Sequence, residues 1–340
     1  MERVNKGENV LVTGGAGYIG SHIVRDLHAA GLHPVVLDNL STGNRDAVLF
    51  GEFIEGDISD AAQVRQIIDQ YQIKSVIHFA ASIVVSESVR IPLKYYYNNS
   101  VNSLRLIETC VDCGIENFVF SSTAAMYGIP ERIPILEDDK LAPINPYGKS
   151  KLVTEMVLKD LAEIHDGFNY IALRYFNVAG ADREGRIGQD YENPTHLITL
   201  ALRAALGEYP MLRVFGTDYD TDDGTAIRDY IHVDDLSNAH ILALDYLRRE
   251  KKSNIFNCGY GIGSSVFEVV DSAKRVTGID FKVENSPRRD GDPPCLVADS
   301  TKIRQHLGWI PRFDDIDTIV RSSWEWEKVL KNKKDGKNQD

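Results

Sequence analysis

The chain has 340 residues, 43% of them hydrophobic and 26% charged, a composition typical of one large globular domain or of a large domain with a smaller partner. A net charge of -12 argues against a surface that binds nucleic acid through bulk electrostatics, but it leaves room for a local basic pocket for one phosphorylated ligand. The start of the chain is polar, and no apolar run approaches the roughly twenty residues of a membrane span, so we expect a soluble, cytoplasmic protein with no membrane contact.

The first predicted elements are a short apolar strand at 9–13, a glycine-rich turn at 14–20 and an amphipathic helix that ends near residue 30. Glycines in such a turn let the backbone approach a pyrophosphate, whose charge the N–H groups at the helix start accept. The glycines stand at 14, 17 and 20, whereas the usual dinucleotide fingerprint is G-x-G-x-x-G. The motif alone is therefore also compatible with a simple tight turn.

The next predicted strand, 34–38, ends in an acidic residue, Asp38. A carboxylate at this point would bond the adenosine ribose hydroxyls and repel a 2′-phosphate, so we expect NAD rather than NADP. The alternation of strand and helix continues and predicts a parallel, doubly wound (Rossmann) sheet of the α/β class. Asp57 could reach an adenine edge, and His78, inside an apolar run, is expected to be a buried, satisfied histidine. The further strands are predicted at 53–57, 75–81 and 117–122.

Tyr147 and Lys151 lie four residues apart in a helix predicted from about 146 to 165, so they share one helix face. A nearby ammonium favours the phenolate form of a tyrosine, and the pair could therefore act as a general base. The preceding strand leads to Thr123. If all three residues reach the carboxyl edge of the sheet, a hydroxyl, a phenol and an ammonium converge beside the cofactor.

Ten motifs of this sequence together resemble the extended short-chain dehydrogenase/reductase family and, within it, the UDP-glucose 4-epimerases. The resemblance covers nearly the whole chain. Several motifs are general to the extended family, whereas 223–225 together with 228–233 is more particular to the epimerases. The motifs occupy residues 14–22, 37–41, 55–58, 78–81, 95–99, 121–128, 146–151, 173–177, 223–225 and 228–236.

The resemblance implies a mechanism for the predicted pair. Tyr147 would remove the proton of the sugar 4-hydroxyl while C4 passes hydride to tightly bound NAD, and Lys151 would hold the nicotinamide ribose. Thr123 would hydrogen-bond the reacting oxygen. No metal is implied. The residues implied in NAD binding are Gly14, Gly17, Tyr18, Ile19, Gly20, Asp38, Asn39, Ser41, Thr42, Gly43, Asp57, Ile58, Phe79, Ala80, Ala81, Asn99, Ser121, Tyr147, Lys151 and Tyr175.

Other functions of the same fold are distinguished by a few residues. A nucleotide-sugar 4,6-dehydratase needs an acid and a base after the catalytic Thr, and here Ala124 and Ala125 follow Thr123. A dehydrogenase or reductase with net redox would use the same Tyr, Lys and Thr, so it stays an alternative. A silent NAD-sensing protein would lose Tyr147 or Lys151, and both are present.

Beyond residue 177 the pattern loses its periodicity, as expected where a chain leaves the sheet for a ligand-binding lobe. We expect a NAD-binding Rossmann domain at 1–177 plus about 228–258, a UDP-sugar lobe at 178–227 plus 259–330, and a polar tail at 331–340. Arginine suits phosphate because its fork donates two parallel hydrogen bonds. The residues implied in substrate binding are Thr123, Tyr147, Phe176, Asn177, His196, Leu197, Arg213, Phe215, Arg228, Arg289, Asp292 and Leu296.

Two positions depart from the family pattern. Ile83 stands where well-known epimerases carry a Lys, and Leu296 falls at a gatekeeper position where a Tyr restricts the pocket to unsubstituted hexoses. We therefore expect UDP-galactose and UDP-glucose as substrates, with some activity on the N-acetylhexosamine pair; pentose sugars stay open. The resemblance also implies a homodimer that pairs the helix around 94–113 with the helix carrying Tyr147.

Overall fold

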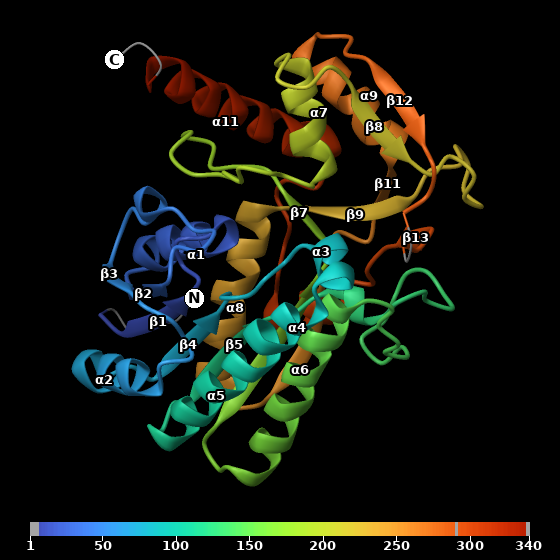
Figure 1. Cartoon of the computed structure of the whole chain (residues 1–340). Helices are drawn as coiled ribbons and strands as arrows, with labels where there is room; N and C mark the ends of the chain where they lie inside the picture. The colour runs from blue at the N-terminus through green and yellow to red at the C-terminus, as the bar shows by residue number, and fades with distance from the viewer. Residues whose placement is uncertain (1–6, 290–291, 338–340) are drawn as a thin grey trace.

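The computed structural model describes residues 7–289 and 292–337. Its largest element is a seven-stranded parallel sheet with the order β10-β6-β5-β4-β1-β2-β3, which confirms the predicted doubly wound sheet (Figure 1). The order reverses between β1 and β4, and ligands of such sheets bind beyond the carboxyl ends of the strands at this point. The strands are β1 (Asn9–Thr13), β2 (His33–Asp38), β3 (Glu52–Glu55), β4 (Ser75–His78), β5 (Asn117–Ser121), β6 (Asn169–Tyr175) and β10 (Asn254–Cys258).

Strands β3 and β4 end two and three residues before the predicted ends. After β3 the side chain of Asp57 accepts from Ser59 N at 2.9 Å, a local hydrogen bond that turns the chain toward the next helix. After β4 the amides of Phe79 and Ala80 both donate to Thr13 O, at 2.9 and 3.1 Å, which closes the ladder. Both turns place the following residues at the carboxyl edge of the sheet.

Helices cover both faces of the sheet (Figure 1). On one face lie α1 and α8, which pack against each other, and on the other lie α2, α5 and α6. Asn145 caps α6 by accepting from Gly148 N at 2.9 Å, and Pro146 occupies its first turn, so the helix starts where the sequence predicts. The helices are α1 (Tyr18–Ala29), α2 (Ala61–Tyr71), α5 (Asn102–Asp112), α6 (Pro146–Ile164) and α8 (Val233–Glu250).

Between β4 and α5 the chain forms two short helices, α3 (Val85–Arg90) and α4 (Pro92–Tyr95), and a π-helical segment, Tyr96–Val101. Inside the π-helical segment, Asn99 is buried and donates to Ser82 O at 2.9 Å and to Ser150 Oγ at 3.1 Å. The amide oxygen of Asn99 accepts from Ser82 N at 2.7 Å. This side chain therefore fastens the loop after β4 to α6, the helix that carries Tyr147.

The second part of the chain builds a smaller lobe around β9, which pairs with β7, β11 and β13. The expected domain boundary at 228 falls inside β9, one residue after its start. A separate pair, β8 and β12, completes the lobe. The bounds are β7 (Asn177–Ala179), β8 (Leu212–Phe215), β9 (Ile227–His232), β11 (Gly263–Ser265), β12 (Val283–Ser286), β13 (Cys295–Leu296), α7 (Leu197–Ala205), α9 (Val266–Thr277), α10 (Thr301–Leu307) and α11 (Ile316–Lys337).

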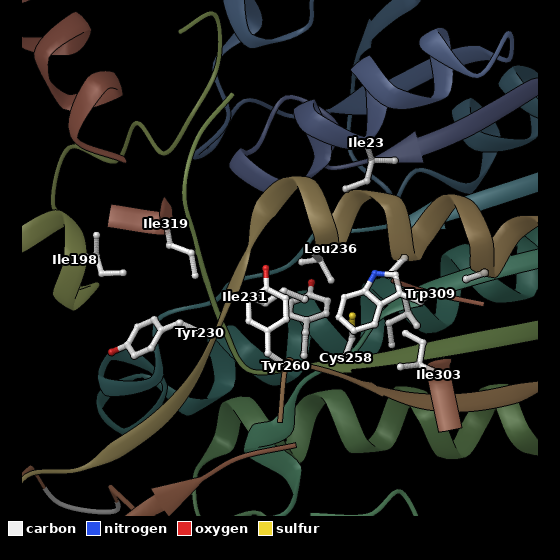
Figure 2. Close-up of a cluster of buried hydrophobic side chains, with 14 of the residues drawn as sticks. Ile23, Ile198, Tyr230, Ile231, Leu236, Cys258, Tyr260, Ile303, Trp309 and Ile319 are labelled. Carbon is white, nitrogen blue, oxygen red and sulfur yellow. The ribbon is translucent and has the colours of Figure 1, made fainter. Parts of the chain in front are cut away.

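One apolar cluster connects the lobe with the sheet. Figure 2 shows Ile198 and Ile319 from the lobe in a row of buried side chains that continues to Leu236 of α8 and Ile23 of α1. Trp309, 1% exposed, donates through Nε1 to Asp235 O at 3.0 Å. A fully buried side chain of this size stabilises the fold by about 2–3 kcal/mol, so the two parts are held together by a continuous core.

The end of the chain is more ordered than a polar tail. Residues 331–337 continue α11; Lys331 Nζ donates to Leu206 O at 3.0 Å, and the rest of the expected tail, 338–340, lies outside the described residues. Within the described part of the chain, no helix is long and apolar enough to cross a membrane. The same residues hold no group of three or more His, Cys, Asp or Glu side chains that could bind a metal ion.

Candidate active site

Tyr147, Lys151 and Thr123 meet at the carboxyl ends of the central strands. Tyr147 and Lys151 stand one turn apart on α6, and Thr123 follows β5. The hydroxyl of Thr123 accepts from Ala125 N at 3.1 Å and caps a short 3₁₀ turn, Ala124–Met126. This cap aims the hydroxyl toward Tyr147, whose phenol hydrogen-bonds it.

Lys151 is 2% exposed, and its Nζ donates to Ser121 O at 2.8 Å. The ammonium also lies 4.8 Å from the centre of the Phe120 ring. Burial lowers the pKa of Lys151 to about 7, because removal from water penalises the charged form, while the charge of Glu155 raises it.

Tyr147 is partly exposed, and its ring meets the edge of Tyr95 at a centroid distance of 6.4 Å. Burial raises the pKa of Tyr147, and the hydrogen bond with Thr123 opposes this shift. Without a further positive charge the phenol stays protonated at neutral pH. The arrangement thus needs a protonated Lys151 to give Tyr147 the character of a base.

The glycine loop fits a dinucleotide pyrophosphate. Gly14 has φ +73°, and a Cβ there would stand 2.6 Å from Ala80 N, so only glycine lets the turn pass this close to the end of β4. A Cβ on Gly20 would lie 2.3 Å from Gly14 O, which keeps α1 tight against the turn. Gly17 forms the N-cap of α1 without a side-chain hydrogen bond, so the first N–H groups of the helix are left for an anion.

The acidic end of β2 is held ready for a polar ligand. Asp38 accepts from Ala16 N at 3.0 Å and from Leu40 N at 2.9 Å. Asn39 donates through Nδ2 to Asp57 Oδ2 at 2.8 Å, so the structure brings two predicted contacts of the adenosine half together. Close by, a Cβ on Gly43 would stand 3.0 Å from Ala16 C, which places the Ser41–Gly43 turn against the glycine loop.

The remaining predicted cofactor residues either line the carboxyl edge of the sheet or contact other parts of the protein. Tyr175 and Ser121 share a hydrogen bond between their hydroxyls beside Lys151, and Phe79 lies 4.9 Å from the His240 ring. Tyr18 donates to Gly180 O at 2.6 Å, which ties the glycine loop to the lobe. Asn99 donates to Ser82 O and Ser150 Oγ, and Ile58 packs in the apolar core; their contacts with NAD stay predictions. His78, satisfied by Thr13 and Ser103, is confirmed as a buried histidine.

The lobe brings its first predicted substrate residues to the same place. Asn177 begins β7 opposite Tyr230 of β9, and His196 is the N-cap of α7. A cavity of about 30 Å³ is lined by Tyr18, Asn177, His196 and Leu197, among others. Residues from the glycine loop and from the lobe thus share one wall.

The arginines of the lobe are already engaged within the protein. Arg228 donates to the carboxylate of Asp292 and, at 2.7 Å, to Pro293 O. The guanidinium of Arg289 stacks 4.1 Å above the centre of the Phe215 ring. Arg213, in contrast, is exposed and stands opposite Glu284 in the β8–β12 register. The guanidinium of Arg228 is therefore paired, that of Arg289 is stacked, and Arg213 is exposed.

Leu296 packs with Phe176, Ala124, Tyr127 and Ile135 in a small apolar cluster. Ala124 follows Thr123 directly, so this cluster brings the predicted gatekeeper Leu296 into the neighbourhood of Thr123. Ile83, the other departure, is 40% exposed in the loop after β4.

Sequence reasoning did not identify a set of lobe side chains that pack around His196. Tyr191 stacks on His196 with a centroid distance of 5.9 Å and an interplanar angle of 24°. Trp326 of α11 donates to Gln189 O at 2.9 Å, and Gln189 in turn meets Nδ1 of His196 at 3.2 Å. The segment around 178–193 carried only a loop signal in the sequence, since these contacts depend on α11, more than a hundred residues later.

A comparison with known proteins agrees with this geometry. Residues 10–259 match the model of the NAD dependent epimerase/dehydratase family. A protein of Azospirillum brasilense named UDP-glucose 4-epimerase is 53% identical over 322 residues, 94% of this chain and 92% of its own.

Solved structures give the same result. The UDP-glucose 4-epimerase of Brucella ovis, in complex with NAD, superposes with a TM-score of 0.90 at 47% identity, covering 93% of this chain and 97% of that one. The UDP-Glc/GlcNAc 4-epimerase of Campylobacter jejuni reaches a TM-score of 0.83 at 49% identity, covering 95% and 100%. The family resemblance of the sequence motifs is thereby confirmed, and the chain belongs to the NAD dependent epimerase/dehydratase family.

Proposed function

We propose that this chain is a UDP-glucose 4-epimerase, which interconverts UDP-galactose and UDP-glucose by inverting C4 of the sugar through a 4-keto intermediate. One observation carries the proposal: Tyr147, Lys151 and Thr123 converge at the sheet edge beside a glycine loop fitted to a dinucleotide. The relatives described above carry the same name over nearly the full chain.

The protein's own groups divide the work of such a reaction. When bound, NAD supplies a hydride acceptor that can return the hydride to the opposite face of the sugar, so no net redox occurs. Tyr147 removes the proton of the 4-hydroxyl and later returns it, while Thr123 holds the reacting oxygen. Lys151 would donate to the nicotinamide ribose and, by its charge, would favour the Tyr147 phenolate. Arg228 and Arg289 hold the diphosphate and so contribute to substrate affinity.

Two related chemistries are less well supported. Dehydration across C5 and C6 needs an acid and a base, and the residues after Thr123 are Ala124 and Ala125, both without a titratable group. A dehydrogenase with net redox would have to exchange NAD with the solution in each turnover. The tie between Tyr18 of the glycine loop and Gly180 O of the lobe, 2.6 Å long, favours retention of the cofactor instead.

The substrate range follows from the gatekeeper cluster. Leu296 packs on Phe176 with an aliphatic side chain smaller than a tyrosine, which leaves room for an N-acetyl group. We therefore expect UDP-GalNAc to be converted more slowly than UDP-galactose. Assays of both sugars under the same conditions measure this, and no detectable UDP-GalNAc conversion would restrict the enzyme to hexoses.

A second copy of the chain is the proposed partner. α3, α4, the π-helical segment and α6 pack together and expose Val89, Leu93, Tyr97 and Met156, at 59%, 65%, 62% and 57%. Apolar side chains gathered on one face mark an interaction surface, and a self-complementary face of two such helices suits a two-fold dimer. Light scattering of purified protein should give twice 38.0 kDa, and Leu93→Asp should give the monomer mass.

The four cysteines support the proposed cytoplasmic location. Cys110, Cys113, Cys258 and Cys295 are all free, and Cys110 and Cys258 are buried. Free thiols are kept reduced in the cytosol, whereas secreted proteins usually pair them. No disulfide is needed to hold this fold.

The central experiment uses purified protein without added cofactor. UDP-galactose is incubated with the protein, and UDP-glucose is measured by chromatography. Product formed without added NAD supports an epimerase that retains its cofactor. An absolute requirement for added NAD, with NADH accumulating in step with turnover, would instead identify a dehydrogenase.

A further inference from the structure

The face of α6 that carries Tyr147 and Lys151 continues to Glu155, one turn further on. The three residues recur every four positions, so their side chains form one stripe on the helix. Lys151 is 2% and Glu155 4% exposed. A buried carboxylate is costly unless the protein compensates its charge, and the proposed reaction gives Glu155 no direct task.

Glu155 is clamped from two strands. Ser122, the residue directly after β5, donates to Oε1, and Arg174 of β6 donates through Nε to Oε1 at 3.1 Å and through Nη2 to Oε2 at 2.6 Å. The Nη1 group of Arg174 donates to Tyr127 Oη and to Glu137 O, both at 2.9 Å. Charge-assisted hydrogen bonds of this kind fix the position of the carboxylate.

Lys151 and Glu155 are fastened to consecutive residues of the chain. The ammonium donates to the carbonyl of Ser121, and the carboxylate accepts from the hydroxyl of Ser122. Within the described residues, no carboxylate oxygen comes within 4.0 Å of Lys151 Nζ, so the two charges act across a short gap rather than as an ion pair. In a buried environment such a gap is only weakly screened.

The other titratable groups around Lys151 supply no negative charge. His78 of β4 has a pKa lowered to about 3 by burial, so it is neutral, and Tyr175 of β6 has its pKa raised by burial. Tyr147 on the same helix is also a neutral phenol without cofactor. Glu155 therefore supplies the negative charge that opposes the burial, which lowers the pKa of Lys151 to about 7, and the positive charge of Arg174 beside Glu155 offsets part of this effect.

We propose that Glu155 is a positioning residue of the active site, whose carboxylate, fixed by Ser122 and Arg174, keeps the buried Lys151 ammonium protonated. The protonated Lys151 in turn lets Tyr147 act as the base. The inference rests on the proposed epimerase function, because it assigns Glu155 a role in that reaction. The base would then depend on three residues of one helix face: Glu155 acts on Lys151, and Lys151 acts on Tyr147.

The first test is Glu155→Gln, which keeps the shape of the side chain and removes its charge. Turnover of UDP-galactose is measured from pH 5 to 9, together with the NAD content of the purified protein. We expect the limb of the profile that reports loss of the Lys151 proton to move down by about one pH unit or more, since an opposite charge at this range shifts a pKa by that amount. KM should change less than kcat.

Two further variants separate charge from structure. Ser122→Ala removes a hydrogen bond to the same carboxylate but leaves its charge, so it should lower the melting temperature without moving the pH profile. Glu155→Gln combined with Arg174→Gln removes both buried charges, which avoids leaving the guanidinium unpaired. This double variant should still show a downward shift, but a smaller one than Glu155→Gln alone, because the positive charge of Arg174 is lost as well.

The outcomes distinguish the inference from the function it rests on. A wild-type protein that does not interconvert the UDP-hexoses overturns the proposed function. A wild type that does, together with a double variant that folds, keeps its NAD and titrates like the wild type, overturns the role of Glu155 alone. A profile shifted equally by Ser122→Ala would show that packing, not charge, is responsible, and would overturn it too.

Discussion

The two sides of the site hold their positive charges in different ways. On the sheet side, Lys151 is buried against a carbonyl and an aromatic ring, with no carboxylate within 4.0 Å in the described structure. On the lobe side, Arg228 is already paired with Asp292. The pKa of a buried ammonium without a close partner is easily shifted, so its protonation can control a reaction. A paired guanidinium can instead leave its carboxylate and bind an anionic ligand. We therefore expect the sheet side to set the rate of the chemistry and the lobe side to set the affinity for the substrate.

We expect the largest change in rate from a substitution of Tyr147, the proposed base on the sheet side. Tyr147→Phe removes the hydroxyl that moves the proton but keeps the ring that meets Tyr95. Loss of a positioned acid or base costs about 10²- to 10⁴-fold in rate, so kcat should fall by that factor while KM for UDP-galactose stays within a few-fold.

Steady-state kinetics and calorimetric UDP binding on the same preparation check this prediction. Unchanged UDP affinity and NAD content would show that the site is intact. If kcat falls less than tenfold, Tyr147 is not the base. If KM rises as much as kcat falls, the sheet side also contributes to substrate affinity, and the proposed division of tasks is wrong.

Sequence reasoning identified the sheet side better than the lobe. The glycine loop, Asp38 and α6 are local features: glycine spacing, a strand followed by an acid, and a capped helix can be read from neighbouring residues. Asn99 also fastens Ser82 to Ser150 from within the π-helical segment, a role that no sequence pattern indicates, while its predicted contact with NAD stays a prediction.

The lobe depends on contacts between distant segments, which no local pattern predicts. Trp326 holds Gln189 across 137 positions of sequence, and α11 extends into the stretch expected to be a polar tail. Its last turns gain their partners from the lobe, for example Lys331 with Leu206 O. The charged and polar composition of this stretch therefore predicted a frayed tail, whereas contacts with the lobe stabilise a helix there.

The second prediction concerns the cofactor loop. Gly14→Ala places a Cβ 2.6 Å from Ala80 N at a φ of +73°, so the loop must move away from β4. We expect the purified variant to retain far less NAD than the wild type. Gly114→Ala is the matched control, because Gly114 also has a positive φ, +69°, but open space around its Cβ position.

The control separates backbone strain from the close approach. Both variants should lose about 1–2 kcal/mol of stability through the left-handed backbone, while only Gly14→Ala should lose cofactor. Absorbance of NAD released on denaturation and thermal unfolding measure the two effects. Equal loss of NAD in both variants would mean that general destabilisation, not the shape of the loop, governs retention.

The smallest effect is expected on the lobe side, from Arg228→Gln. The change removes a guanidinium that can move from Asp292 to the substrate diphosphate, so KM for UDP-galactose should rise about tenfold while kcat changes little. Arg275→Gln is the control, since Arg275 is also paired, with Asp317, but on the outer side of α9. Its KM should equal that of the wild type, and both variants should keep their NAD. A fall in kcat without a rise in KM at Arg228 would contradict the division, because the lobe would then act on the chemistry itself.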